Sequence, residues 1–499
     1  MTGCRLLGAA LASCAMGLPT VAQADTLREA LAAAYRSNPS LEAARAQQRA
    51  TDEGVQIERA AGLPGVAADA TYIEFLRTSS NSFTAPSRNL GVGLDLNVPL
   101  YTGGAVKNAV RAAETRVDAG RAELRGSESQ LFSRVVGAYM DVIRNQALVG
   151  LSINQVAVLR INLEATSDRF EIGDLTRTDI AQSQSRLALA TSDLRSAEAN
   201  LIAARETYIE LVGQAPDDLQ PPPPLPGLPQ SADMAVDVAL DANPDLIAAR
   251  ERAEAAGFDI DVAGAGRLPT VSAFIGGDYS NFFGTLGGPT SQGFAQAETT
   301  ANAGLRLSIP IFQGGRPAAL ERRAQAGAAA ALEQAIATER NVIAQTRAAF
   351  SSYTAANAII QSAQTAVSAA ELSLEGVRAE NSIGNRDVLD VLNAEQELLV
   401  ARSQLVTARR NAYVAGFSLL AAMGRAEARD LGLADAETGR GLLYDPVVNY
   451  DRVRGRIWDW RREPDPVAQS TRTVDIPAAT AEIPVEDVPD DSALRRFDR

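Results

Sequence analysis

The chain has 499 residues and a formal net charge of -14, contains no histidine, and has two cysteines, Cys4 and Cys14. Without histidine, and with both thiols near the start, the Ser-His-Asp and Cys-His arrangements of hydrolytic enzymes and the usual zinc sites are excluded. The acidic balance and the lack of a basic stripe argue against nucleic-acid binding. We therefore expect no enzyme, no metal or cofactor, and no nucleic-acid partner.

Residues 1–24 have the pattern of a secretory signal peptide. Arg5 precedes an apolar stretch, and Ala22-Gln23-Ala24 forms an A-x-A cleavage site. Cleavage there would leave a mature chain that begins at Asp25 and has no thiol. The stretch 11–14 (Leu-Ala-Ser-Cys) also fits a lipid-attachment site, so lipidation of Cys14 is the alternative. Either route takes the protein out of the cytoplasm.

The rest of the chain is an internal duplication. Asn38-Pro39 returns as Asn243-Pro244, offset by 205 residues, and the stretch 98–104 returns at 309–315, offset by 211. Single landmarks also recur at the offset of 211: Gly173 and Gly384, Asp179 and Asp390, Leu187 and Leu398, and Gly213 and Gly424. Such order predicts a first structural repeat over 25–220, a stiff proline-rich linker over 221–231, and a second repeat over 232–425. A C-terminal segment, 426–450, follows.

Each repeat is predicted to contain the same elements. A first helix covers about 25–61 or 232–264, and two strand-like segments follow it. A Gly-Gly pair then opens a long helical stretch that is broken near Gly173 or Gly384. At ~1.5 Å per residue, 104–172 would form a rod of roughly 100 Å, which is typical of packed coiled coils. The helices alone would also fit an intracellular coiled-coil scaffold.

Two of the strand-like segments, 91–98 and 301–309, alternate between apolar and polar residues. An apolar face against lipid and a polar face against water is what a transmembrane strand requires. The predicted lipid-facing residues are Val92, Leu94, Leu96, Leu305, Leu307 and Ile309. The predicted lumen-facing residues are Asp95, Asn97, Arg306 and Ser308. Segments 65–77 and 270–280 alternate less regularly, and a half-buried sheet in a soluble domain is the other interpretation.

Membrane physics then constrains assembly. No stretch of 18 or more apolar residues follows the signal, so a membrane protein with this sequence would span as a β-barrel. Four strands cannot close a barrel, because the smallest bacterial barrels have about eight. Open edges in hydrocarbon cost several kcal/mol per unpaired group. Several subunits must share one barrel, and the sequence leaves open whether two or three do.

With these landmarks, residues 25–450 resemble the TolC family of outer-membrane efflux and type I secretion channels. The resemblance is carried by the two Asn-Pro repeats, the two Pro-x-x-x-Gly-Gly junctions and the helix-turn segments 170–184 and 382–396. It implies a mainly α fold with a membrane β-barrel. Long helical hairpins of a homotrimer would form an α-barrel joined to a shared 12-stranded β-barrel, with four strands per chain. Residues 426–450 would be an equatorial segment.

The resemblance also implies a passive exit duct in the outer membrane of a Gram-negative bacterium, extending into the periplasm. Family members contact outer-membrane lipid and dock on a periplasmic adaptor (a membrane fusion protein) and an inner-membrane ABC or proton-driven pump. Their cargo is a drug or an exported protein. The stretch 442–454 resembles members linked to both, and type I protein secretion is the preferred interpretation. A soluble periplasmic coiled-coil adaptor is the alternative function, whereas a solute porin would need eight or more strands in one chain.

The two helix turns are where the resemblance implies a periplasmic gate. The matching positions are Thr178, Asp179, Arg386 and Asp390, and Asp387 is an extra acid. The best-known member has a tyrosine where Asn381 stands and an aspartate where Asn393 stands. Three copies of Asp390 around an axis would raise one another's pKa and attract cations. Arg386 could donate a charge-assisted hydrogen bond to a carboxylate such as Asp179, although both could be ordinary solvated charges.

Residues 451–499 are predicted to be a mostly disordered tail. Trp458 and Trp460, the only tryptophans, lie near its start, where the chain could still dock on the duct. Proline and acidic residues dominate 484–491, a composition that cannot bury a core.

Overall fold

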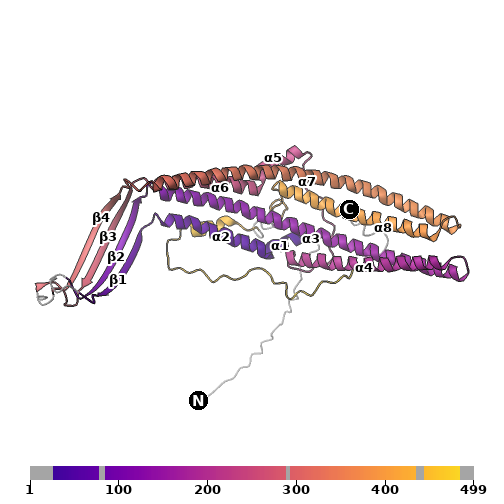
Figure 1. Cartoon of the computed structure of the whole chain (residues 1–499), viewed down its shortest axis with the longest axis horizontal. Coiled ribbons are helices and arrows are strands. Elements are labelled where there is room, and N and C mark those ends of the chain that lie inside the picture. The colour runs from indigo at the N-terminus through magenta and orange to yellow at the C-terminus, as the bar shows by residue number, and fades with distance from the viewer. Residues whose placement is uncertain (1–25, 78–84, 288–292, 434–442, 484–499) are drawn as a thin grey trace, which may run out of the picture.

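The computed structural model describes residues 26–77, 85–287, 293–433 and 443–483. The expected signal peptide, with Cys4 and Cys14, and the acidic stretch 484–499 lie outside the described residues. The described chain is elongated, with a four-stranded sheet at one end and helices along the rest of its length (Figure 1). The predicted mainly α class with four strands is confirmed.

The order of elements in the first half recurs in the second. The first half contains α1 (Leu27–Ser37), α2 (Pro39–Ala60), β1 (Gly65–Glu74), β2 (Arg88–Tyr101), α3 (Ala105–Glu171) and α4 (Arg177–Val212). The second contains α5 (Ala232–Ala242), α6 (Pro244–Ala265), β3 (Thr270–Asn281), β4 (Ala297–Ser308), α7 (Arg316–Ser382) and α8 (Val388–Ala422). A further helix, α9, spans Pro446–Val453.

The prediction of a single helix at the start of each repeat is wrong, because each repeat begins with two helices. Asn38 and Asn243 have extended backbone, with ψ of 124° and 121°, and separate α1 from α2 and α5 from α6. The proline that follows each asparagine disfavours helical backbone at the preceding residue but fits the first position of a new helix. The asparagine side chain then caps that helix, accepting from the N–H of Ser40 or Asp245 at 3.0 Å.

The sheet is antiparallel, in the order β1-β2-β3-β4. One row of the register runs Ala68, Leu94, Gly277 and Ala301, so the predicted apolar positions of different strands share a face. β4 ends at Ser308, which leaves Ile309 just beyond the strand in which it was predicted. β1 and β4 are the two edges, and each pairs on one side only.

The helices continue the order of the strands. Next to the sheet, α2 packs on α3, α3 on α6 and α6 on α7; farther away, α4 packs on α3, α3 on α8 and α8 on α7. The thickest core lies where α1, α3 and α4 meet, around the fully buried Phe132, Tyr139 and Tyr208. Each such ring contributes ~1.5–3 kcal/mol by its burial. In the described part of the chain, none of the helices combines the length and the apolarity needed to cross a membrane.

Residues 451–499 were predicted to be a mostly disordered tail, but residues 451–483 are held against the helices. α9 crosses the expected boundary, and the chain after it lies against the helices. Arg205 donates to the Glu482 carbonyl at 2.9 Å, and Glu206 accepts from the Ala479 N–H at 2.8 Å. Composition could not reveal this, because side chains of α4 satisfy the extended backbone and the tail needs no core of its own.

Candidate functional site at the helix turns and the sheet

The α3–α4 and α7–α8 turns lie at the end of the molecule opposite the sheet (Figure 1). Gly173 and Gly384 turn the chain with φ of 87° and 82°, a left-handed conformation that favours glycine. The interruption of the long helices that the sequence predicts near these glycines is therefore present in the structure.

The first turn is closed by a capping box at the start of α4. The Asp179 carboxylate accepts from the Thr176 backbone N–H at 2.8 Å and from the Thr176 hydroxyl at 2.7 Å. These hydrogen bonds, the one from the hydroxyl first, hold the pKa of Asp179 below its usual value. Thr178 is exposed beside it.

The second turn is held by Arg386. Its Nε lies 2.7 Å from Glu380 Oε2, and its Nη1 lies 3.7 Å from Asp390 Oδ2. The hydrogen bond and charge of Glu380, followed by the charge of Asp390, raise the pKa of Arg386. The predicted bond from Arg386 to Asp179 is absent within the described chain, because each residue is satisfied by a nearer partner on its own turn. Asp387 occupies the N-cap position of α8 without a side-chain capping bond.

A buried carboxylate that the sequence analysis missed joins the two hairpins behind these turns. Glu395 on α8 is 3% exposed. Both of its oxygens lie 2.9 Å from Asn162 Nδ2 on α3, and Arg378 on α7 donates to it at 3.1 Å. Asn393, one of the two departures from the best-known member, accepts from Arg186 of α4 at 2.8 Å. The signal for Glu395 was its spacing, because it falls three residues after the buried Leu392 on the same helix face.

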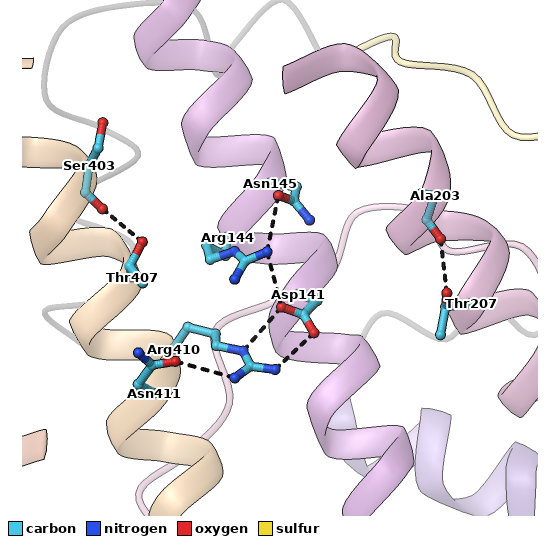
Figure 2. A network of polar contacts seen from close by, with 9 residues as sticks. All are labelled: Asp141, Arg144, Asn145, Ala203, Thr207, Ser403, Thr407, Arg410 and Asn411. Carbon is cyan, nitrogen blue, oxygen red and sulfur yellow. Dashed lines mark hydrogen bonds and ion pairs between the residues drawn. The ribbon is translucent and has the colours of Figure 1, made fainter. Parts of the chain in front are cut away.

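A second polar junction, drawn in Figure 2, joins α3 to α8 about midway along α3. Arg410 of α8 forms a bidentate pair with Asp141 of α3, at 3.1 and 2.8 Å. Arg144 adds a contact of 3.4 Å to the same carboxylate. Planar two-bond pairs of this kind fix geometry as well as adding energy, so α3 and α8 are held in one register.

The predicted apolar residues of the sheet are open to the surroundings of the single chain. Leu94, Leu305 and Leu307 are 57%, 72% and 60% exposed, and Ile309 is 55% exposed. Val92 is also exposed, and Leu96 is half-buried. The two faces remain a prediction.

On the opposite face, acidic and amide side chains lie over glycines. A methyl group at Gly93 would stand 2.6 Å from Asp69 Oδ1 and 3.3 Å from Asp278 Oδ1. Asp95 and Asn302 crowd Gly276 in the same way, at 3.0 and 2.8 Å. The guanidinium carbon of Arg306 lies 5.2 Å from the centroid of the Phe274 ring. Asn97 and Ser308 are exposed. In the described part of the chain, no group of three or more acidic residues has the arrangement of a metal site.

Comparison with known proteins identifies the class. The family model described as outer membrane efflux protein matches residues 30–214 and 235–425. The chain therefore belongs to the outer membrane efflux protein family, which confirms the predicted resemblance and the outer-membrane location. The predicted function as an outer-membrane channel for efflux or secretion is confirmed with it.

Individual proteins are similar over nearly their whole length. Outer membrane efflux protein BepC of Brucella suis biovar 1 is 32% identical over 444 residues, which cover 89% of this chain and 93% of BepC. Outer membrane protein TolC of Vibrio cholerae is 27% identical over 433 residues, 84% of this chain and 95% of TolC. The crystal structure of VceC from Vibrio cholerae shares the fold, with a TM-score of 0.68 at 23% identity over 80% of this chain and 96% of VceC.

Proposed function

We propose that this chain is one subunit of a homotrimeric exit duct, and that three copies close the sheet and the helical layer by joining edge to edge. The observation that carries the proposal is that the sheet ends in two strands that each pair on one side only, and that the outermost helices of the row α2-α3-α6-α7 lie on the same two sides of the chain. β1 and α2 end one side, and β4 and α7 end the other. An open edge has no place in hydrocarbon, so β4 of one copy would pair with β1 of the next.

The exposure of α7 supports an interface along that edge. Eight of the 67 residues of α7 are buried, against twenty-three of the 67 residues of α3. Leu332, Ile336, Ile359 and Leu372 of α7 are between 45% and 71% exposed. Apolar side chains spread along a helix of this length would be covered by α2 and α4 of a neighbouring copy, as a coiled-coil seam requires.

Three copies would give twelve strands, enough to enclose a channel. The apolar face with Val92, Leu94 and Leu305 would then contact outer-membrane lipid. The opposite face would line the lumen with Asp95 and Asn97, together with Asp69 and Asp278, which share that face in the register. The lumen would be acidic at this end.

The gate of the duct would lie at the two helix turns. Thr178, Asp179, Arg386, Asp387 and Asp390 all lie in or next to these turns. Arg386 ties its own turn together through Glu380 and Asp390, and Glu395 fastens one hairpin to the other. Opening the end of the duct would require the hairpins to part, so these contacts would favour the closed state.

The duct would be passive and would have no catalytic role. Its periplasmic end would dock on an adaptor, and through it on an ABC or proton-driven pump in the inner membrane. Cargo would be an exported protein or a small molecule; the named relatives include an efflux protein, BepC. A soluble adaptor is not favoured, since the matched family is that of outer-membrane proteins.

Purified protein in planar bilayers tests this function. We expect discrete conductance steps, and native mass spectrometry of the same sample should give a complex of three chains. A monomer that leaves the bilayer electrically silent would overturn the proposal.

A further inference from the structure

The segment after α9 exposes large apolar side chains on a chain that is held in place. Ile457, Trp458 and Trp460 are 74%, 74% and 85% exposed. Tryptophan is usually well buried, and adjacent exposed aromatic residues indicate a surface that meets something apolar. Residues 457–462 are called the tryptophan loop below.

The tryptophan loop is anchored before and after its aromatic residues. Before it, α9 packs on α2, where the Asn449 amide donates to the buried Asp52 carboxylate at 2.7 Å. Glu463 then closes the loop, because it pairs with both Arg452, at 3.2 Å, and Arg456. Contacts at both ends therefore fix the position of the loop relative to α2 and α9.

That place is the end of α2 nearest the sheet. Gln56 donates to the Arg456 carbonyl at 2.6 Å, and Arg59 donates to the Arg454 carbonyl at 2.6 Å. Both donors lie in the last two turns of α2, and β1 begins at Gly65. Six residues span at most roughly 20 Å, so the loop lies close to the level at which the strands begin. The chain after α9 turns back beside this end of α2 (Figure 1).

Other elements also expose apolar side chains where the strands meet the helices. Tyr101 ends β2 and is 49% exposed, and Ile311 and Phe312, between β4 and α7, are 95% and 87% exposed. Elements far apart in the sequence therefore expose apolar side chains near the junction of sheet and helices.

The charges of the tryptophan loop are suited to phosphate. Arg461 and Arg462 are exposed and have no ion-pair partner among the described residues, and Asp459 is the only acid in the loop. Aromatic rings flanked by arginines are typical of the membrane–water interface, where the ring sits at headgroup level and the guanidinium meets lipid phosphate.

We propose that the tryptophan loop is a membrane-interface anchor, which seats Trp458 and Trp460 among phospholipid headgroups of the periplasmic leaflet while Arg461 and Arg462 bind their phosphates. The proposal rests on the proposed function in one respect, namely that the sheet crosses the outer membrane. The anchor would set the position of the duct along the membrane normal, although the loop is not part of the sheet.

Because Trp458 and Trp460 are the only tryptophans of the chain, intrinsic fluorescence reports on this loop alone. The full chain is reconstituted into vesicles of phosphatidylethanolamine and phosphatidylglycerol, with plain or brominated acyl chains, and acrylamide is added on both sides. We expect a blue-shifted emission that brominated lipid quenches and acrylamide quenches poorly. Quenching by acrylamide alone would mean a loop in water, and quenching by neither would mean a loop buried against protein; both outcomes overturn the anchor.

Two further measurements make the result specific. The double variant Arg461→Ser, Arg462→Ser should weaken insertion in phosphatidylglycerol vesicles by roughly fivefold for each arginine, whereas Arg472→Ser, an exposed arginine farther along the tail, should leave it unchanged. Equal effects of the two would overturn the role of the phosphates. Flotation separates the hypotheses, since protein that does not float with vesicles contradicts the proposed function, and protein that floats with water-exposed tryptophans contradicts the anchor alone.

Discussion

Asn38 and Asn243 form the same hydrogen bond in the two halves of the chain. The side-chain Nδ2 of each lies 2.9 Å from a carbonyl in the last turn of a long helix, that of Leu211 for Asn38 and that of Ala422 for Asn243. Each asparagine therefore caps one helix with its oxygen and holds the end of another with its nitrogen. This is the physical reason why the Asn-Pro pair and the end of the long helix recur together.

The glycine that follows each of these helix ends should be intolerant of any side chain. Gly424 has φ of 71°, and a methyl group there would stand 2.6 Å from the Ala242 carbonyl carbon. We expect Gly424→Ala to destabilise the protein by ~1–3 kcal/mol because the backbone would be strained. The clash with Ala242 would add to this cost. Gly54→Ala is the control, because this glycine lies within α2 with no neighbouring atom in reach, and alanine there should stabilise by up to ~1 kcal/mol. Thermal unfolding of both variants measures the difference; equal midpoints would contradict the packing described.

Stability should depend on pH through Glu128 of α3. Burial, and next the charge of Glu427, raise the pKa of Glu128 to about 7, against the lowering effect of its hydrogen bond from the Ala428 N–H. Because the folded pKa lies above the unfolded value of 4.5, the unfolded chain ionises first, and stability falls as pH rises from about 4.5 to about 7.

Glu128→Gln removes this titration and can still accept from Ala428. We expect the variant to be more stable than the wild type at pH 8, by up to about 3 kcal/mol, and the advantage to shrink toward pH 5. Denaturant midpoints at the two pH values provide the measurement. A constant difference between the proteins would contradict a raised pKa at this residue.

Neighbouring residues of β4 should differ sharply in their tolerance of charge. Leu307→Arg places a cation on the proposed lipid face, at a cost of ~2–4 kcal/mol near the bilayer midplane and less toward its edge. Ser308→Arg places the same charge on the proposed lumen face and should be tolerated. The yield of heat-resistant oligomer in outer-membrane fractions compares the two variants, and equal losses would show that the faces are misassigned.

Glu395 should hold the closed end of the duct. Glu395→Ala leaves Asn162 and Arg378 without their shared carboxylate, so the hairpins lose a buried junction, and single-channel conductance in planar bilayers should rise. Glu397→Ala removes an exposed acid two residues away and should leave conductance unchanged. A low resting conductance in both variants would place the restriction elsewhere.

The duplicated order of elements and the mainly α class could be predicted, because proline, glycine and strict alternation act locally. The turn residues could also be predicted from the sequence, as Gly173 and Gly384 illustrate. Side-chain partners that lie on different helices could not be predicted. Arg386 was predicted to bond Asp179, but its partners are Glu380 and Asp390, which only the fold of its own turn brings within reach. Glu395 was missed for the same reason, since its ligands come from two other helices.

Disulfide trapping can show whether three copies close edge to edge. Cleavage of the predicted signal would leave no native cysteine, so one cysteine can be placed on the edge of β1, at Ala68, and a second in turn at Ala297, Thr299, Ala301 or Ala303 of β4. At the register where the Cβ atoms approach to about 4 Å, oxidation in membranes should give covalent dimers and trimers and nothing larger. No cross-link at any of the four positions, or a ladder that stops at two or continues beyond three, would contradict the trimeric duct.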